Sequence, residues 1–308
     1  MDISVIIVSW NVRDFLKRCL ASIYRRGDAA SFEVIVVDNA SSDGSADMAS
    51  REFPKARVIR NGKNLGFSAA NNIGLKDAAG ELVFFLNPDT ELQDGTIGRI
   101  ISFMAAHPEA AGLGCRLVYP DGSLQHSARR FPSFFTDLME KLYLDWLFPG
   151  SGFFNYYHMG LWPHDRLREI DVPFGACLVV RKSVLDKIGP MDERFFMYYD
   201  EIDLCYRIRQ AGFRIYFTPD ISVTHHSNKS SDQVIGEATV WKMRSKAKFF
   251  RKHYGAPGAA GLVFNLIAER LLVYGPVSLW HLFTKKPANI AGIKEYLGLE
   301  WREITGAL

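Results

Sequence analysis

The run Leu82–Leu86 constrains the fold of this chain most, because its apolar residues end abruptly at Asn87-Pro88-Asp89. A continuous apolar run of this length is typical of a strand buried on both faces, as in the middle of a parallel sheet. Pro88 cannot donate to a sheet ladder, so the strand has to end there. The sequence therefore predicts a carboxylate, Asp89, at the carboxyl end of a central strand, where open α/β sheets bind their ligands.

Strand-like and helix-like segments alternate along the first third of the chain. The apolar patterns predict strands at 3–9, 33–38, 57–60 and 82–86, and helices at 12–24, 45–53, 67–79 and 95–106. Alternation of this kind predicts an α/β fold with a mostly parallel central sheet flanked by helices on both sides. No GxGxxG pattern follows the first strand, so the fingerprint of ordinary dinucleotide-binding domains is missing.

The middle of the chain, roughly 120–169, is rich in aromatic residues, Gly and Pro. We expect a long excursion with short helices there, because long insertions in compact domains are usually functional or disordered. After it the patterns predict a strand at 172–181, helices at 183–188 and 200–210, and strands at 213–217 and 221–224.

Composition sets broad limits on the protein class. The 308 residues suffice for one large or two modest domains, and the net charge of +3 is too small to indicate a nucleic-acid partner. The four cysteines form no CxxC pair, which favours reduced thiols in the cytosol. Met1-Asp2 leads directly into the first strand without a basic region, so we expect no secretory signal.

The C-terminal part differs in character from the rest. Six basic residues and no acidic one lie within 241–253, and the apolar stretch 259–283 follows, interrupted by Glu269-Arg270 and by Pro276. A charged pair near the centre of this stretch favours an interfacial or re-entrant helix pair over a simple spanning helix. The alternative is that 241–253 is a solvated face and that 259–283 packs on the core.

Two polar clusters follow the earlier strands. Asp38 ends the second strand, where a carboxylate can accept hydrogen bonds from a ribose or a base edge; Ser42 and Asp43 in its loop could merely cap the next helix. Asn71 and Asn72 lie inside the third predicted helix, although Asn is a poor helix-interior residue. These two asparagines either bind a ligand or clamp the neighbouring loop.

Two further clusters carry acids or histidines. Asp89 suits a Mg²⁺ or Mn²⁺ ion that is also held by substrate phosphates, and His225 or His226 is a candidate second ligand. Asp200 and Glu201 open a helix behind a run of large side chains, and one of them could act as a general base. The alternatives are a turn or cap for Asp89, helix-dipole compensation for the acids, and structural roles for the histidines.

In this order the segments resemble a family 2 glycosyltransferase with a GT-A fold, and most closely its rhamnosyltransferase-like branch. The segments that carry the resemblance are VIIVSWN (5–11), EVIVVDNASSDGS (33–45), NLGFSAANNIG (64–74), FLNPDTEL (85–92), GACLVVRKSVLDKIGPMDERFF (175–196) and YYDEIDLCYRIRQAGF (198–213). LQHSARRFPS (124–133) and VTHHSNKS (223–230) also look like that branch.

The resemblance implies roles for particular residues. The base-reading acid of the family maps to Asp38, and its metal-binding DxD motif maps to Asn87-Pro88-Asp89, where only the final acid is present. The catalytic base is normally the Asp of a Glu-Asp pair; this chain has Asp200-Glu201, so the base is Glu201 by position, with Asp200 as the alternative. The metal-binding histidine falls at His225 or His226. Together with the asparagines read from the sequence, we expect the nucleotide-sugar-binding residues to be Ser9, Asn11, Asp38, Asn64, Asn71, Asn72 and Asn87.

The resemblance also implies an activity and a location. We expect an inverting, metal-dependent transferase that moves a sugar, rhamnose from dTDP-rhamnose, to a saccharide or lipid-linked saccharide at the cytoplasmic face of the inner membrane. The basic stretch 241–253 adds an anionic membrane surface as a partner. The expected domains are a GT-A domain at 1–240, with a nucleotide-sugar half at 1–118 and an acceptor half at 119–240, and a helical segment at 241–308.

Three alternatives remain open at this point. The donor could be a UDP- or GDP-sugar. The chain could be a non-catalytic nucleotide-sugar-binding module, although Asp38, Asp89 and Glu201 are all present. A nicotinamide oxidoreductase is disfavoured by the missing glycine fingerprint.

Overall fold

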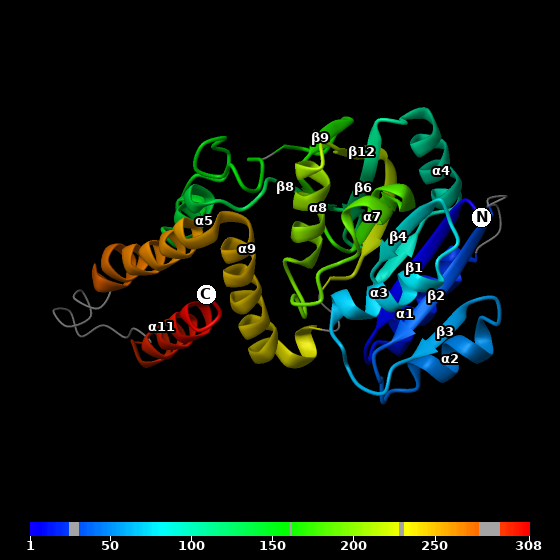
Figure 1. Ribbon diagram of the computed structural model, residues 1–308, viewed down its shortest axis with the longest axis horizontal. Coiled ribbons are helices and arrows are strands. Elements are labelled where there is room, and N and C mark those ends of the chain that lie inside the picture. Colours follow the sequence, from blue (N-terminus) through cyan, green and yellow to red (C-terminus); the bar gives the residue numbers. More distant parts are fainter. Residues whose placement is uncertain (25–30, 161, 228–230, 277–289) are drawn as a thin grey trace. The chain divides into compact units, whose positions relative to one another are not determined.

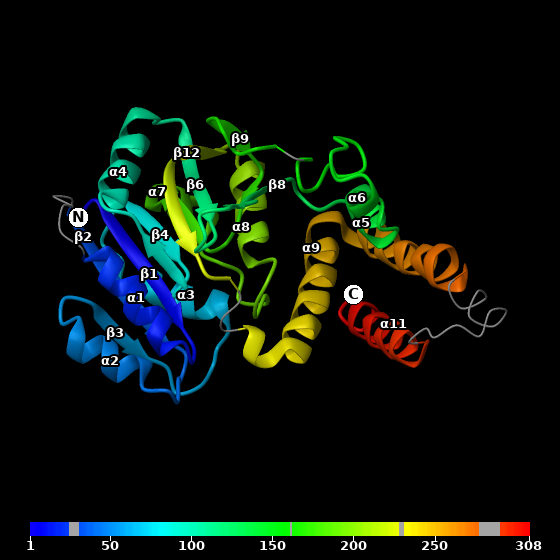
Figure 2. The ribbon, with the colours of Figure 1, turned by 180° about the vertical axis from the view of Figure 1, so that it is seen from behind.

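The structure is a computed structural model, and it describes residues 1–24, 31–160, 162–227, 231–276 and 290–308 (Figures 1 and 2). The chain divides into two compact units. Unit 1 consists of Met1–Arg129 and Pro163–Ile235, and unit 2 of Arg130–Trp162 and Gly236–Leu308. Segment 130–162 thus groups with the C-terminal helices rather than with the sheet. The functional division at residues 118 and 240 stays a prediction.

Unit 1 is built on one large mixed sheet with the strand order β3-β2-β1-β4-β11-β6-β12-β5, with β7 paired to β6 and β9 paired to β12. The strands are β1 (Ile3–Ser9), β2 (Phe32–Asp38), β3 (Arg57–Arg60), β4 (Leu82–Leu86), β5 (Thr90–Leu92), β6 (Ala110–Val118), β7 (Leu124–Gln125), β9 (Arg168–Ile170), β11 (Cys177–Arg181) and β12 (Arg214–His225). A separate pair joins β8 (Ala128–Arg129) to β10 (Val172–Pro173).

The first half of the sheet confirms the predicted alternation. β1 pairs in parallel with β2 and β4, and β2 in parallel with β3. The connecting helices are α1 (Arg13–Ile23), α2 (Ser45–Glu52), α3 (Phe67–Asp77) and α4 (Thr96–Ala106). Each predicted helix is confirmed to within two residues at either end.

Both faces of this half are covered, as the continuous apolar strands require. Ile3, Val5 and Ile7 of β1 share one core cluster with apolar residues of α1, α2 and α4. The opposite face carries α3, where the Cα of Gly74 lies against Ile6. Figure 2 shows α1 in front of the sheet, with α3 on the far side.

The second half of the sheet departs from the prediction. β4 is buried throughout but pairs antiparallel with β11 on one side, so it lies in a mixed rather than a purely parallel sheet. The strand predicted at 172–181 is wrong as a single element, because β10 and β11 belong to different sheets. The strands predicted at 213–217 and 221–224 form one strand, β12, with a register shift between Thr218 and Ser222.

β6 was not predicted. Its nine residues include Gly112 and Gly114, which weaken the usual strand pattern. At Gly114 only glycine fits, because a Cβ there would lie 2.4 Å from Cβ of Pro173. The remaining helices of unit 1 are α7 (Lys182–Ile188) and α8 (Asp200–Gln210), and a 3-10 turn covers Ser231–Val234.

Unit 2 is helical in the residues described. It contains α5 (Phe134–Lys141), α6 (Leu144–Leu147), α9 (Ile235–Glu269), the π-helical turn η2 (Arg270–Tyr274) and α11 (Ile290–Thr305). The short helices α5 and α6 confirm the expected character of the middle segment. α9 joins the basic and the apolar C-terminal stretches, with a kink at Gly255. Residues 277–283 of the apolar stretch lie outside the described residues.

Candidate active site

The ends of β1 and β2 present two buried polar side chains side by side. Ser9 and Asp38 are register partners at the carboxyl ends of these strands, and their side chains are 0% and 3% exposed. Oδ2 of Asp38 accepts from the backbone N–H of Ser41. Within the described part of the chain, Ser9 Oγ and Asp38 Oδ1 have no hydrogen-bond partner. Buried polar atoms are usually paired, so this pair is suited to a polar ligand group.

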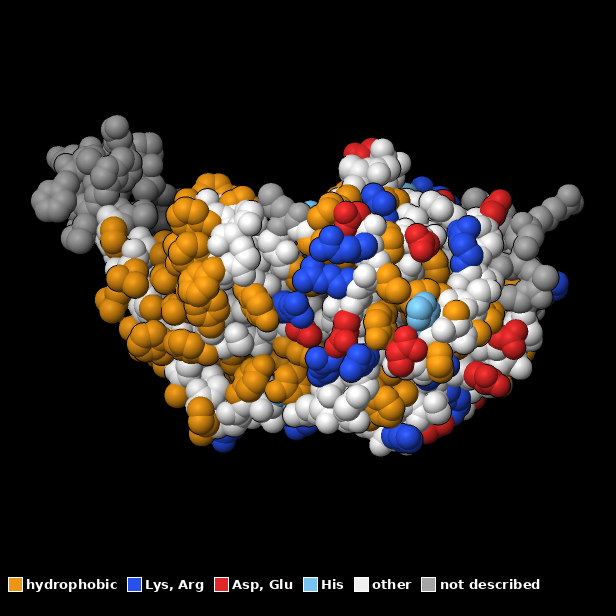
Figure 3. All heavy atoms as spheres, turned by 90° about the horizontal axis from the view of Figure 1, so that it is seen from above, with side chains coloured by type: hydrophobic (Ala, Val, Ile, Leu, Met, Phe, Trp, Pro, Cys, Tyr) orange, Lys and Arg blue, Asp and Glu red, His pale blue; other side chains and the backbone are white. Residues whose placement is uncertain are grey.

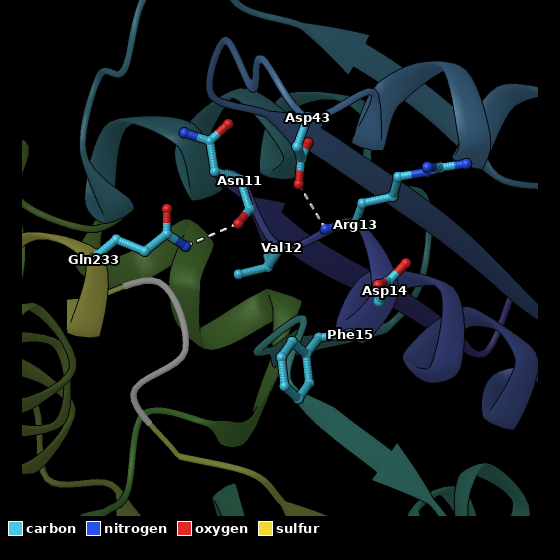
Figure 4. A pocket seen from close by; sticks show the side chains of 7 residues that line it. All are labelled: Asn11, Val12, Arg13, Asp14, Phe15, Asp43 and Gln233. Carbon is cyan, nitrogen blue, oxygen red and sulfur yellow. Dashed lines mark hydrogen bonds between the residues drawn. The ribbon is translucent and has the colours of Figure 1, made fainter.

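A pocket opens beside these strand ends, lined by Asn11, Val12, Arg13, Asp14, Phe15, Asp43 and Gln233 (Figure 4). Asn11 adopts a left-handed backbone with φ of 53°, and its Oδ1 accepts from the N–H of Ser42 at 2.8 Å. Gln233 donates to the carbonyl of Asn11 at 2.8 Å. Asn11 therefore ties the β1 loop to the β2 loop.

The alternative of a capping role is supported for Asp43. Its Oδ1 accepts from the N–H and hydroxyl of Ser45, the first residue of α2, and its Oδ2 accepts from the N–H of Arg13. Partial burial opposes ionisation of Asp43, but these hydrogen bonds outweigh it and lower the pKa of the carboxyl. Ser42 contacts Asn11 instead of the helix.

Asn64, Asn71 and Asn72 form hydrogen bonds within α3 and the loops beside it. Oδ1 of Asn64 accepts from the N–H of Gly66. Asn72 donates to the carbonyl of Met191 at 2.8 Å and accepts from the N–H of Met191 at 3.0 Å. Asn71 donates to the carbonyl of Phe67. The clamping alternative therefore describes Asn72, whose amide fastens the 190–196 loop to α3.

Asn87 and Asp89 lie at the carboxyl end of β4, as predicted. The N–H of Asn87 donates to the carbonyl of Ala176 at 3.0 Å. Asp89 is 6% exposed, and β5, which begins at the next residue, pairs antiparallel with the end of β12. Because Thr90 pairs with His225 in that ladder, Asp89 comes to lie beside the histidine pair.

The two histidines have different surroundings. His225 is 1% exposed, and its Nε2 lies 3.4 Å from Oδ1 of Asp89. His226 points elsewhere, with its Nε2 2.8 Å from Glu91 Oε1 and its ring against Phe15 at 5.3 Å. Of the two, His225 is therefore the one whose ring nitrogen faces Asp89.

Gln125 orients the ring of His225. The amide nitrogen of Gln125 donates to the hydroxyl of Ser227, so its Oε1 faces Nδ1 of His225 at 2.8 Å. An amide oxygen only accepts, so Nδ1 is the donor of this pair, and in the neutral ring Nε2 then carries the lone pair and faces Asp89. A hydrogen bond to the second ring nitrogen is the usual way in which a metal-ligating histidine is oriented. Asp89 and His225 thus fit a divalent cation. Gln125 was not singled out from the sequence, although the resemblance through 124–133 covered it.

Asp200 and Glu201 differ in burial. Asp200 is 3% exposed, and its burial, together with the neighbouring Glu201 carboxylate, raises the pKa of Asp200 well above its usual value. Glu201 is partly exposed and lies against Gly175, where a Cβ would be 3.4 Å from its Cδ. Asp203 is fully buried and bonds Arg207 at 2.9 Å. Of these three acids, Glu201 is therefore the one that is not buried.

The backbone before this acid pair is strained. Tyr198 and Tyr199 both have positive φ, at 64° and 62°. Two successive bulky residues in this conformation are uncommon, and such strain clusters at functional sites. Here the two tyrosines turn the chain into α8 at Asp200.

The segment 174–176, just before β11, contacts three parts of the candidate site. The ring of Phe174 lies 5.6 Å from that of His225, Gly175 contacts Glu201, and the carbonyl of Ala176 accepts from Asn87. Three successive residues thus contact the histidine, the acid and the β4 loop. Gly175 was not singled out from the sequence, because its close contact with Glu201 exists only in the folded chain.

Comparison with known proteins decides the family. A family model described as Glycosyl transferase family 2 matches residues 4–189. The chain belongs to this family. It is accordingly a glycosyltransferase, and its mixed α/β sheet is the fold expected from the resemblance.

Two curated relatives are rhamnosyltransferases. An N-acetylglucosaminyl-diphospho-decaprenol L-rhamnosyltransferase of Mycobacterium tuberculosis is 31% identical over 242 residues, which cover 74% of this chain and 76% of that protein. Rhamnosyltransferase WbbL of Escherichia coli is 23% identical over 263 residues, which cover 80% and 92% of the two chains. These matches support the rhamnosyltransferase-like branch.

A solved structure shows the same fold at low sequence identity. Mannosyltransferase PcManGT from Pyrobaculum calidifontis, in complex with GDP-Man and Mn²⁺, has a TM-score of 0.58 and 16% identity, and the match covers 99% of this chain and 82% of that chain.

Proposed function

We propose that this chain is an inverting, metal-dependent rhamnosyltransferase that uses dTDP-rhamnose and a lipid-linked saccharide acceptor in the synthesis of a cell-surface polysaccharide. The observation that carries the metal dependence is the pair Asp89 and His225, with Nε2 of His225 directed at the carboxylate and its Nδ1 held by Gln125. The donor and the acceptor rest on the relatives.

The donor would bind along the carboxyl ends of β1, β2 and β4. Asp38 and Ser9 offer the buried oxygens that a nucleoside could satisfy, and Asn11 shapes the pocket beside them. Asn64, Asn71, Asn72 and Asn87 belong to the same proposed site; the amides of Asn64 and Asn72 hold its loops rather than point into open space. Asp38 remains the residue proposed to bind the nucleoside.

Asp89 and His225 would hold the cation. A bound Mg²⁺ or Mn²⁺ supplies charge neutralisation on the leaving diphosphate. A carboxylate and one imidazole are few ligands, so substrate phosphate oxygens would complete the set. We therefore expect the cation to bind tightly only together with the nucleotide. His226 is assigned to Glu91 and not to the cation.

Glu201 would act as the general base. It accepts the proton of an acceptor hydroxyl while the hydroxyl oxygen attacks the anomeric carbon from the face opposite the diphosphate. The bond between the anomeric carbon and the diphosphate breaks as the new glycosidic bond forms. Because the raised pKa of Asp200 favours its protonated form, Glu201 is the acid of the pair proposed to be ionised.

The proposed donor, dTDP-rhamnose, rests on the relatives rather than on the fold. The neighbour PcManGT was solved with GDP-Man, and GalNAc-T7, with a TM-score of 0.57 and 15% identity, was solved with UDP, GalNAc and Mn²⁺. One fold thus accepts different bases. The names of the curated relatives, in contrast, specify rhamnose as the transferred sugar and, in the mycobacterial protein, a decaprenol-linked acceptor.

The proposed location is the cytoplasmic face of the inner membrane. By length and composition, α9 together with η2, Ile235–Tyr274, could cross a membrane, and 33% of its most apolar 18 residues are buried. Core helices of soluble proteins can reach the same length and apolar composition. The basic stretch before it would add roughly 1 kcal/mol of attraction to anionic lipid for each Lys or Arg near the surface.

A panel of nucleotide-sugars tests the proposal. Thermal unfolding is measured with dTDP-, UDP- and GDP-linked sugars, each with Mg²⁺, with Mn²⁺ and with a chelator. We expect stabilisation by dTDP-rhamnose that depends on the cation, and transfer to a polyprenyl-diphosphate saccharide. A preference for UDP-sugars would overturn the rhamnose donor, and equal stabilisation in chelator would overturn the metal dependence.

A further inference from the structure

The second half of α9 buries polar and apolar residues together and leaves other large apolar side chains exposed. Asn265 and Glu269 are 0% and 3% exposed, whereas Phe264, one residue away, is 57% exposed. Leu271 and Leu272 in η2 are 67% and 65% exposed. A helix of a soluble protein normally buries its apolar side. This helix is apolar on its exposed side as well as on its buried side, and its polar residues lie inside.

The buried polar residues have partners inside unit 2. Asn265 donates to Oδ2 of Asp137 at 2.9 Å, and Asp137 also pairs with Lys246. Glu269 lies 3.2 Å from Nζ of Lys141, which also pairs with Glu300 of α11. Because Asp137 and Lys141 are one turn apart on α5, they form a polar seam between α5 and α9.

Arg270, the basic residue of the Glu269-Arg270 pair, also finds its hydrogen-bond partners within unit 2. Arg270 donates to the carbonyls of Leu266 and Leu297, and its guanidinium lies 5.2 Å from the ring centre of Trp301. The Glu269-Arg270 pair, which argued against a simple spanning helix, therefore does not charge the exposed side of α9.

A second, distant segment adds aromatic side chains to the same unit. Trp146, Phe148 and Phe153 are 74%, 49% and 62% exposed. Ring contacts connect this segment to α5, where Phe135 lies 4.9 Å from Phe153. Its neighbour Phe134 in turn lies 5.8 Å from Phe264 of α9. Figure 3 shows hydrophobic side chains gathered over this part of the surface.

We propose that this surface docks into the headgroup region of an anionic lipid bilayer. We call it the aromatic face, and define it by Trp146, Phe148, Phe153, Phe264, Leu271 and Leu272. Large exposed apolar patches mark interaction sites, and aromatic side chains favour the boundary between lipid and water. Polar residues turned into the bundle are what a lipid environment requires.

Charge complementarity selects lipid as the partner. The first half of α9 carries six basic residues and no acidic one over 241–253. Lys246 and Arg244 pair within the unit, while Arg251 is exposed. A basic stretch that adjoins an exposed apolar helix, here across the kink at Gly255, attracts a protein to anionic lipid. This inference deepens the proposed function, on which it rests for its biological role.

Flotation of the full-length protein with vesicles of phosphatidylethanolamine and phosphatidylglycerol tests the aromatic face. Two independent variants remove different parts of it, namely Trp146→Ser with Phe153→Ser, and Leu271→Ser with Leu272→Ser. Tyr119→Ser with Leu167→Ser is the matched control, since these side chains are 41% and 44% exposed in unit 1. Thermal unfolding and dTDP-rhamnose binding are measured on every variant.

We expect wild type and the control to float, and each face variant to partition at least about tenfold less, with unchanged unfolding midpoints, because burial of each large apolar side chain favours the bilayer. Brominated lipids should quench tryptophan fluorescence in wild type and quench it less in Trp146→Phe. Equal quenching in Trp146→Phe would overturn the proposal even if the serine variants fail to fold.

Other outcomes separate this inference from the proposed function. Flotation of both face variants at the wild-type level, or no flotation of wild type, overturns the aromatic face as a membrane surface. A lipid-free dimer that the face variants dissociate, in a protein that does not float, assigns the face to a second copy instead. A protein that floats but binds no dTDP-sugar overturns the proposed donor alone.

Discussion

Oδ1 of Asp89 lies 3.4 Å from Nε2 of His225, although the two residues come from distant parts of the sequence. The antiparallel pairing of β5 with β12 brings them together, and the N–H of His226 donates to the carbonyl of Asp89 at 2.9 Å. The backbone therefore fixes which histidine faces the carboxylate. His225 ends the strand facing inward, and His226 faces the opposite side, as adjacent residues in an extended chain do.

The two histidines should respond differently to substitution. His225→Ala should weaken cation-dependent binding of the nucleotide-sugar by at least roughly 10–100-fold, the loss that follows removal of a residue that only orients a metal ligand. His226→Ala should change that affinity little, because its ring contacts Glu91 and Phe15 rather than Asp89. Calorimetric titration of donor with Mn²⁺ and with chelator measures both. A larger loss for His226→Ala would reverse the assignment.

Glu201→Gln should leave donor binding intact and lower kcat by roughly 10²–10⁴-fold, the usual contribution of a general base. Glu201→Asp, which keeps the carboxylate but shortens its reach, should retain part of the activity. Single-turnover transfer assays separate chemistry from binding. Normal turnover by Glu201→Gln would shift the role of base to Asp200.

Asp200 should make the protein less stable as the pH rises. Its pKa in the folded state is raised above the usual 3.8 by burial and by Glu201, so the folded chain holds a proton that the unfolded chain has released. Stability from this group is therefore present below about pH 3.8 and is lost as the pH rises through the raised pKa. Asp200→Asn should raise the unfolding midpoint at pH 7 more than at pH 4. Equal shifts at both values would contradict this.

Gly66 should tolerate alanine less well than Gly189 does. Both have backbone angles that are almost restricted to glycine, with φ near 84° and ψ near 170° to 180°. Strain alone should cost each variant about 1–3 kcal/mol of unfolding free energy. A Cβ at Gly66 would also lie 2.4 Å from the carbonyl oxygen of Phe196, while the space at Gly189 is open.

Urea unfolding of both glycine variants measures this difference. Gly66→Ala should be the less stable protein, and it should also lose transfer activity, since Phe196 precedes the turn into Asp200. Equal unfolding free energies would show that the contact with Phe196 is relieved at no cost.

Local signals in the sequence were sufficient for the first half of the sheet. Continuous apolar runs ended by Asp38 and by Pro88 predict β2 and β4, and helical spacing predicts α1 and α3, because each pattern depends on near neighbours. β6 escaped prediction because Gly112 and Gly114 weaken its strand pattern, and only the close approach of Pro173 explains Gly114.

The sequence by itself determined the family, the residue types of the site and the strand ends that carry Asp38 and Asp89. Only the tertiary structure shows that His225 rather than His226 faces Asp89, since this depends on the pairing of β5 with β12 and on a hydrogen bond to Gln125. It also decided that Asp200 is buried and Glu201 is not, and that Glu269 faces Lys141. These outcomes depend on contacts between residues far apart in the chain, which no local pattern encodes.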